Sequence, residues 1–314
     1  MASDDTDLTG TTDNPDAPAA GWNTNVPDTD VDAFEDVRPR LFGIAYRMLG
    51  SVAEAEDVVQ DAWLRWQGTD RSVVRNPAAF LTTTTTRLAI NAATSAHARR
   101  ETYVGPWLPE PVDTAADPAL GAERTEALGL AVLLLLEKLT PAERASYVLR
   151  EAFDYSHREI ADVLDISEVN ARQVARRARE RLDSERSAPV SPAEQRRLLE
   201  SFVAAAQAGD LDGLERLLAR DVVVRPDGGG EVHASRVELH GSARTVTFLD
   251  NILRKYWQDS TLRVVDANGG AALLVTSADG EPQALVALDA SDEGIDHLFI
   301  QVSPSKLRQF APVA

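Results

Sequence analysis

The stretch from Thr140 to Arg186 constrains the fold most, because it combines two strong helix starts with a tight break. Thr140-Pro-Ala-Glu143 and Ser156-His-Arg-Glu159 both match the capping box, in which Ser or Thr begins a helix and Glu bonds back three positions later. Asp165 predicts the end of the second helix, and Ser167 is placed to cap a longer third one. The sequence therefore predicts three successive short helices separated by tight turns.

The helix that begins at Ser167 separates apolar from polar residues. Val174, Ala178 and Leu182 share one face, which predicts burial on that side. The other sides carry side chains that bind phosphates and base edges in the major groove, namely Asn170, Arg172, Gln173, Arg176 and Arg177. Two amphipathic helices with a basic second helix predict a helix-turn-helix that binds DNA. A helical hairpin with an arginine-coated solvent face is the alternative.

The charge of the whole chain runs against this prediction, since its net charge is −18. Neutralisation of phosphates by Lys and Arg supplies most non-specific affinity for DNA. The acidic excess is unevenly placed, because residues 1–32 hold eight Asp and no base, whereas residues 33–100 hold nine Arg against seven acidic residues. We therefore expect weak binding to free duplex and a larger partner that holds the chain on DNA.

Composition excludes several classes of protein. The chain has 314 residues and no cysteine, so disulfides and thiolate metal sites are excluded, and nothing in the sequence indicates a metal or a cofactor. No apolar run approaches the ~20 residues of a membrane span, and the N-terminus has no signal-peptide pattern. We expect a cytoplasmic protein with no membrane partner, in which residues 1–31 form a disordered acidic tail.

Residues 32–100 show the pattern of a helical bundle. An apolar stripe predicts one helix from Asp32 to Leu49 that ends at Gly50, and Ser51 begins the next. On that second helix Asp57, Gln60 and Asp61 form a compact acidic patch, for which a solvated helix face is the alternative. Asn76-Pro77 then precedes a third helix, predicted over 78–98 despite five consecutive Thr residues, whose β-branches weaken it.

Several of these segments together resemble a known family, the bacterial sigma-70 factors of the extracytoplasmic-function (ECF) type. Arg38–Trp66 and Asn76–Tyr103 resemble region 2 of such factors, and the helix-turn-helix resembles region 4. ETYVGPWLPEPV (Glu101–Val112) and SEVNARQVARRAR (Ser167–Arg179) resemble the subgroup that carries an extra C-terminal SnoaL-like domain. The resemblance implies a region 2 domain over 32–103, a linker over 104–124, a region 4 domain over 125–186 and a SnoaL-like domain over 191–314.

The resemblance also implies partners and contacts, namely core RNA polymerase and promoter DNA. Polymerase contacts fall on the acidic patch of Asp57, Gln60 and Asp61. Contacts to the melted −10 element fall on Arg87, Asn91, Arg99 and Arg100. Contacts to the −35 element fall on Ser167, Asn170, Arg172, Gln173, Arg176 and Arg177. The sequence departs from the family along Thr82–Thr86 and Ala92–Ser95, which leaves fewer phosphate contacts and no aromatic platform for splayed bases.

The linker and the helix after it have distinct compositions. Four prolines in residues 104–118 predict an extended connector. Within it Trp107 belongs either to a specific contact element or to an anchor on a neighbouring domain. The segment from Thr125 to Leu139 is apolar nearly all round, which predicts a helix buried on more than one side.

Residues 191–314 show an α+β order. Two helices are predicted up to Leu218 and another around Ala243–Tyr256. The expected strands are Val222–Arg225, Val232–Leu239, Leu262–Val265, Ala271–Thr276, Ala284–Leu288 and Ile295–Val302. This order resembles the SnoaL-like cone, in which a curved sheet wraps helices and leaves a pocket.

The loop formed by Asp227, Gly228, Gly229 and Gly230 resembles a loop of the fused subgroup and is expected to be regulatory. Three glycines carry a large entropic cost unless the backbone must approach something closely. Members of the subgroup commonly have Lys next, whereas this chain has Glu231, and Ser303-Pro-Ser-Lys-Leu stands where they have Asn-Pro-Asp-Lys-Leu. Contacts that rely on that Lys are therefore not expected here.

The function that we predict is a promoter-specificity subunit regulated in cis by its C-terminal domain, and not an enzyme. A small-molecule ligand in that domain is a further partner left open. One alternative is a small-molecule-binding or isomerase/cyclase-type enzyme domain fused to a DNA-binding module, with Asp227, His233, His240 and His297 as available groups. Another is a free-standing regulator that binds duplex tightly without polymerase.

Overall fold

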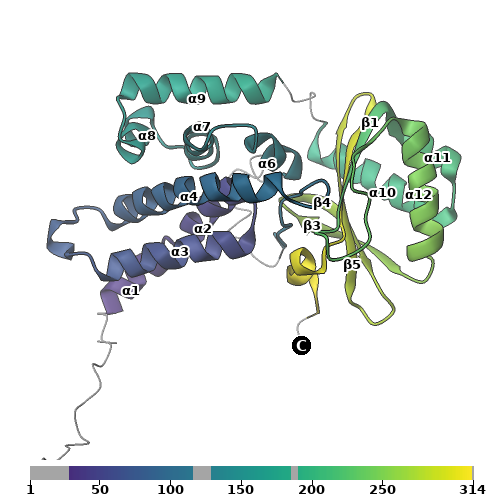
Figure 1. The fold of residues 1–314 in the computed structure, drawn as a ribbon, viewed down its shortest axis with the longest axis horizontal. Helices are drawn as coiled ribbons and strands as arrows, with labels where there is room; N and C mark the ends of the chain where they lie inside the picture. The colour runs from purple at the N-terminus through teal and green to yellow at the C-terminus, as the bar shows by residue number, and fades with distance from the viewer. Residues whose placement is uncertain (1–27, 116–128, 185–189, 313–314) are drawn as a thin grey trace, which may run out of the picture.

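The computed structural model describes residues 28–115, 129–184 and 190–312. Figure 1 shows two groups of helices on one side of a sheet and a third group of helices on its other side. None of the helices in the described ranges is long and apolar enough to cross a lipid bilayer.

The first helical bundle contains four α-helices and a short 3-10 turn: α1 (Asp28–Glu35), α2 (Arg38–Leu49), α3 (Val52–Gln67), η1 (Arg71–Val73) and α4 (Pro77–Glu101). The single helix predicted over 32–49 was wrong, since α1 and α2 are separate. Pro39 stands in the first turn of α2, where its missing N–H breaks no helical bond. Residues 28–31 were assigned to the disordered tail but belong to α1; the rest of that tail lies outside the described residues.

The second bundle is short and confirms the predicted helix starts. It consists of α6 (Leu130–Leu136), α7 (Pro141–Tyr147), the π-helical turn η3 (Val148–Ala152), α8 (His157–Leu164) and α9 (Glu168–Asp183). Thr140 and Ser156 both form complete capping boxes. Asp165 ends α8 with a left-handed φ of 56°. The start of the predicted apolar helix at 125–128 lies outside the described residues, whereas α6 is buried as expected.

The C-terminal domain is a mixed sheet covered by helices. Its elements are α10 (Pro192–Ala208), α11 (Leu211–Leu217), β1 (Leu218–Asp227), β2 (Leu239–His240), α12 (Ser242–Tyr256), β3 (Thr261–Ala267), β4 (Gly270–Thr276), β5 (Pro282–Ser291), β6 (Gly294–Gln301) and η4 (Pro304–Phe310). The strand order is β2-β1-β6-β5-β4-β3, in which only β1 and β6 run parallel. Helices α10, α11 and α12 cover one face, which confirms the predicted α+β cone.

The strand predicted over Val232–Leu239 was wrong for most of its length. Only Leu239 and His240 pair with β1, and the preceding residues form a loop. The hydroxyl of Ser235 donates to the carbonyl oxygen of Val237 at 2.9 Å, so this loop is closed by local bonds. Val232 and Val237 are exposed, which explains why their β-branched pattern did not produce a buried strand.

The described residues form one core shared by both helical bundles, a second core inside the C-terminal domain and a small third cluster where η4 packs on the sheet. The shared core also contains Leu108 and Val112 of the linker and Phe299 of β6. The second core lies between the sheet and its covering helices. The other face of the sheet thus packs against η4 and toward the helical bundles, as Figure 1 shows.

Candidate functional site

The segment 103–115 connects all three parts of the molecule. The predicted extended connector is confirmed over these residues, and Trp107 serves as an anchor between neighbouring parts. Its ring lies under the guanidinium of Arg100, 3.8 Å from the ring centroid, and 5.1 Å from Nζ of Lys306. One aromatic side chain therefore contacts a helix of the first bundle and the C-terminal turn.

Asp227, at the end of β1, is the centre of the contact between this segment and the C-terminal domain. Its carboxylate is fully buried and accepts hydrogen bonds from Tyr103 Oη (2.7 Å), the Leu108 amide (2.8 Å) and Lys306 Nζ (2.7 Å). Gln301 Nε2 and the Gly229 amide donate to it as well. A buried charge is tolerated when it is paired and its lone pairs are satisfied, and this carboxylate meets both conditions.

Lys306 completes this site from η4. Its ammonium group donates to the Leu108 carbonyl oxygen at 2.7 Å as well as to Asp227. Burial lowers the pKa of Lys306, and the neighbouring carboxylate of Asp227 opposes that shift. We call the set of Asp227, Lys306, Tyr103 and Leu108 the latch, because two of its members lie on the segment 103–115 and two on the C-terminal domain.

The glycine loop owes its composition to close packing around the latch. A Cβ at Gly228 would lie 2.9 Å from the Val232 carbonyl oxygen. Gly229 has a φ of +63°, in the left-handed region that other residues rarely adopt, and lies against Ser303. The close approach expected from three glycines therefore occurs within the chain itself.

Glu231 and the C-terminal turn bond to each other. Its carboxylate accepts hydrogen bonds from the hydroxyls of Ser303, at 2.7 Å, and Ser305. These bonds lower the pKa of Glu231, with Ser305 making the largest contribution. The two departures from the subgroup pattern, Glu231 and the serines of the C-terminal turn, therefore meet in one contact.

A second set of bonds joins the linker to the first bundle and to the β3–β4 turn. The hydroxyl of Tyr46 donates to the Glu110 carbonyl oxygen at 2.6 Å and accepts from Asn268 Nδ2 at 2.7 Å. Asn268 also exchanges bonds with Val112, donating its amide and accepting with its side-chain oxygen. Burial of its side chain raises the pKa of Tyr46. The phenol is therefore a neutral structural group.

A buried arginine cluster, formed by Arg100, Arg144 and Glu137, joins the two helical bundles. Both oxygens of Glu137 accept hydrogen bonds, one from Arg100 and the other from Arg144 Nη1 at 2.6 Å. Arg100 also donates to the Leu49 carbonyl, and Arg144 to the Met48 carbonyl at 2.6 Å. Burial lowers the pKa of Arg144, opposed by Glu137. Arg100, a predicted −10 contact, is thus held in an intrachain contact here.

The other predicted −10 residues on α4 are divided between two environments. Arg87 donates from Nε to the Val163 carbonyl at 2.8 Å and from Nη2 to the Asp162 carbonyl at 3.3 Å, both near the end of α8. Asn91 is exposed, and Arg99 is an exposed side chain that pairs with Glu54. The −10 residues are therefore not gathered into one open surface in this arrangement.

The threonine run on α4 lies in the contact between the bundles. The hydroxyls of Thr82 and Tyr155 lie 3.1 Å apart in a hydrogen bond. Thr85 and Thr86 are also buried, and their hydroxyls have no hydrogen-bond partner among the described residues. The small β-branched side chains thus allow α4 to pack closely against its neighbours.

Helix α9 presents its predicted −35 residues openly. Ser167 caps the helix by accepting from the Asn170 amide, which confirms the predicted helix start. The side chains of Asn170, Arg172, Gln173, Arg176 and Arg177 are all exposed. Val169 in the first turn is 65% exposed and was not singled out from the sequence. Such an apolar group suits a thymine methyl at a base edge.

The acidic patch on α3 is exposed along its whole length. Asp57, Gln60 and Asp61 all reach solvent, and Leu64, one turn further on, is 55% exposed. The sequence indicated the three polar residues but not Leu64. The sequence could have indicated Leu64 as well, because it follows Asp57, Gln60 and Asp61 at helical spacing and so lies on the same face of α3.

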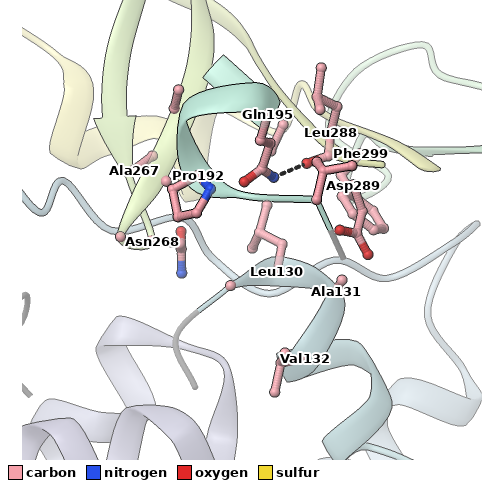
Figure 2. Close-up of a pocket in the computed structure, with 16 residues that line it drawn as sticks. Leu130, Ala131, Val132, Pro192, Gln195, Ala267, Asn268, Leu288, Asp289 and Phe299 are labelled. Carbon is pink, nitrogen blue, oxygen red and sulfur yellow. Dashed lines mark hydrogen bonds between the residues drawn. The ribbon is translucent and has the colours of Figure 1, made fainter. Parts of the chain in front are cut away.

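Several pockets lie in or beside the C-terminal domain, and three of them adjoin the sheet. The first, of about 240 Å³, lies where α6 meets α10 and the sheet; Figure 2 shows Leu130, Ala131 and Gln195 around it, with the Gln195 amide bonded to the Leu288 carbonyl at 2.6 Å. A second, of about 520 Å³, lies between the domains and is lined by His297. A third, of about 720 Å³, lies between α12 and the sheet.

The four groups available for an enzyme site do not gather in one pocket. Asp227 belongs to the latch, and His233 lines the pocket at α12. His297 bonds to Arg225 at 3.3 Å, and burial lowers its pKa. His240 is exposed beside Glu238. Within the described residues no group of three or more His, Asp or Glu side chains could hold a metal ion.

Two family models match this chain, one over each helical bundle and in the same order along the sequence. The model for "Sigma-70 region 2" matches residues 33–100, and that for "Sigma-70, region 4" matches residues 129–182. A helical bundle followed by a helix-turn-helix, each matching one of these regions, defines a factor of the sigma-70 class.

Full-length relatives narrow this class. The chain is 40% identical over 233 residues to the ECF RNA polymerase sigma factor SigJ of Mycobacterium tuberculosis, covering 72% of this chain and 74% of that protein. It is 30% identical over 280 residues to the probable ECF sigma factor SigI of the same species, covering 88% and 93%. The crystal structure of M. tuberculosis SigJ matches with a TM-score of 0.72 and 33% identity over 90% of this chain and 100% of that chain.

The chain belongs to the ECF sigma factors of the sigma-70 family. It therefore functions as an RNA polymerase sigma factor, which directs promoter recognition and transcription initiation. The structural similarity to SigJ covers 90% of this chain, so it includes the C-terminal domain as well as the two helical bundles.

Proposed function

We propose that this sigma factor is held closed by its C-terminal domain, and that release of the latch frees its two DNA-binding helices. In the open form α3 binds core RNA polymerase, α4 binds the −10 element and α9 binds the −35 element. In the closed form the contact between the two bundles keeps α4 and α9 together. The C-terminal domain thus controls initiation in cis.

The observation that carries this proposal is the bonding of Arg87 on α4 to the end of α8. The −10 and −35 elements lie on the order of 25 base pairs apart, about 85 Å at ~3.4 Å per base pair. Helix α4 has 25 residues and spans only about 37 Å at ~1.5 Å per residue. A helix-turn-helix bonded to α4 lies too near to reach one element while α4 holds the other, so opening must precede promoter binding.

The latch supports the proposal because it connects the C-terminal domain to the segment 103–115, which follows the end of α4. Replacement of Asp227 leaves Lys306 buried without its counter-charge, which strongly destabilises docking. The test is runoff transcription with core polymerase and the full-length Asp227→Asn variant. We expect more transcript at limiting sigma concentration.

The control for this experiment is Asp279→Asn, a carboxylate in the β4–β5 turn, remote from the latch. A chain that ends just before Ser303 removes Lys306 and provides a second way to open the latch. Equal activity of the wild-type chain, Asp227→Asn and the shortened chain would remove cis-regulation and leave sigma activity itself intact.

For the polymerase contact we propose the surface of Asp57, Gln60, Asp61 and Leu64. An acidic and amide surface with one apolar side chain suits a basic helical partner. Charge reversal of Asp57 and Asp61 to Lys should abolish co-purification with core polymerase. Reversal of Asp212 on α11 is the matched control, and undiminished binding of the double variant would refute this assignment.

We further propose that the chain acts in the cytoplasm, where promoter DNA and polymerase are available, and that it catalyses no reaction. The dispersal of Asp227, His233, His240 and His297 supports a non-catalytic role. A small-molecule partner remains compatible with the fold.

A further inference from the structure

The pocket between α12 and the sheet has the size and lining of a small-molecule site. Its volume of about 720 Å³ falls within the range of roughly 300–1,000 Å³ typical of such sites. The walls are mainly apolar and are formed by Val232, Phe248, Ile252, Trp257, Ile300 and Val302. These side chains come from α12, β6 and the loop that follows the glycines. A ligand with an apolar body would therefore bury most of its surface here.

The polar groups around this pocket favour an anion. Lys255 lines it from the last turn of α12, together with Asn251 one turn earlier, and no Asp or Glu is among the lining residues. Within the described part of the chain Lys255 makes no ion pair, and its ammonium lies 5.1 Å from the Tyr256 ring centroid. The adjacent Arg254, by contrast, pairs with Asp250 at 2.7 Å. Lys255 is exposed, so a cation that has no ion-pair partner in the described ranges lies at the rim of an apolar cavity.

The wall of the pocket is continuous with the latch. Val232 to Ser235 follow directly on the glycine loop that begins at Asp227. On the other strand Val302 lines the pocket, and its amide donates to the Asp227 carbonyl at 2.8 Å. Pro304 also lines the pocket and lies two residues before Lys306. An occupant would touch the two segments that hold the latch groups in place.

We infer that this pocket binds an apolar organic anion, with Lys255 facing the acidic group, and that its occupancy shifts the latch. The ligand class is an acid with a hydrocarbon or aromatic body, bearing a carboxylate or sulfonate. The shift of the latch rests on the proposed function, whereas binding does not. By linkage, a ligand that binds the two latch states unequally changes their populations by the same factor.

The binding test uses two fluorescent probes of similar shape on the full-length chain. One is 1-anilinonaphthalene-8-sulfonate, which is anionic, and the other is N-phenyl-1-naphthylamine, its uncharged counterpart. In Lys255→Gln we expect about tenfold weaker binding of the anionic probe and unchanged binding of the neutral one. Asn251→Trp, at the exposed rim, should obstruct the pocket and weaken both probes.

Arg254→Gln is the matched control, since it removes the neighbouring cation whose charge is already paired. It should alter neither affinity. Competition by decanoate and by 1-naphthoate then distinguishes a flexible chain from a rigid ring as the natural body. If Lys255→Gln weakens both probes equally, or neither, the anion site is refuted.

The coupling test measures amide hydrogen exchange of residues 103–112 with and without saturating anionic probe. We expect a change in protection in the wild-type chain and none in Asn251→Trp. Binding that depends on Lys255 but leaves exchange unaltered would overturn the coupling and keep the site. An Asp227→Asn variant with ordinary transcription would instead refute cis-regulation, whatever the probes show.

Discussion

Helices α4 and α9 both carry arginines predicted to contact DNA, yet the two helices use them differently. On α9 the charged side chains are exposed and pair locally, as Arg172 does with Glu168 and Arg176 with Glu180, one turn away. On α4, Arg87 and Arg100 bond to groups more than 30 residues away in sequence. Local surface pairs are weak and easily exchanged for phosphates. Long-range contacts must be broken first.

The difference teaches that one of the two predicted DNA-binding helices exposes its polar side chains, while the other holds two of its arginines in intrachain contacts. The predicted DNA-contacting side chains of α9 are already exposed, and the helix lies at the outer edge of the molecule (Figure 1). On α4, Asn91 and Arg99 are exposed, whereas Arg87 and Arg100 can leave their partners only if the contact between the two bundles breaks. Intrachain contacts on the predicted −10 residues are therefore consistent with the proposed control by the C-terminal domain.

The largest effect on this comparison is expected from Arg100→Ala. It removes a buried partner of Glu137 and the cation over Trp107, so we expect the free energy of unfolding to fall by about 3 kcal/mol in urea denaturation. Arg99→Ala is the control, because Arg99 is next to Arg100 and makes only an exposed ion pair with Glu54. Its loss should lower the free energy of unfolding by less than ~1 kcal/mol. Equal effects of the two substitutions would show that the contacts of Arg100 stabilise the fold no more than an exposed ion pair does. The contrast between α4 and α9 would then be lost.

The next effect concerns α9 and should appear in binding rather than in stability. Arg177 is exposed and has no ion-pair partner among the described residues, so Arg177→Ala should leave the free energy of unfolding unchanged. We expect about tenfold weaker promoter binding by the polymerase complex and a shallower salt dependence. Arg181→Ala, near the far end of α9, is the matched control. A loss of stability without a loss of promoter binding would show that Arg177 makes intrachain contacts, as the arginines of α4 do, and does not contact DNA.

A smaller effect of opposite sign is expected from Thr85→Val on α4. The substitution keeps the shape of the side chain and removes a buried hydroxyl that has no partner among the described residues. The free energy of unfolding should rise by about 1 kcal/mol. Thr83→Val, at a less buried position, is the comparison. If Thr85→Val destabilises the chain, the hydroxyl has a partner and the contact between the bundles is more polar than described.

The smallest effect is expected from Arg87→Ala, because its bonds to the Asp162 and Val163 carbonyls lie near the surface. We expect the open population to rise roughly threefold, measured as faster amide exchange in α8. Arg65→Ala, an exposed arginine of α3, is the control. If Arg87 itself binds the −10 element, promoter binding falls in spite of this opening. Unaltered exchange would show that Arg87 does not restrain the helix-turn-helix.

The sequence by itself determined the local elements and the order of the domains. Capping boxes at Thr140 and Ser156 depend on residues three apart, so their pattern is complete in the sequence. The same holds for the inward stripe of α9 and for the exposed patch on α3. The failure at Val232–Leu239 has the opposite cause, since β-branched residues produce a strand only where a sheet can bury them.

Only the tertiary structure decided which charged groups remain open. Asp227 and Lys306 both stood in recognisable motifs, yet nothing in their spacing showed that they would meet around the Leu108 backbone. Likewise Glu231 with Ser303, and Arg87 with the end of α8, are pairs set by packing between distant segments. A charged side chain can be buried only beside a partner group. Which group becomes that partner depends on the packing of distant segments, which the sequence alone does not show.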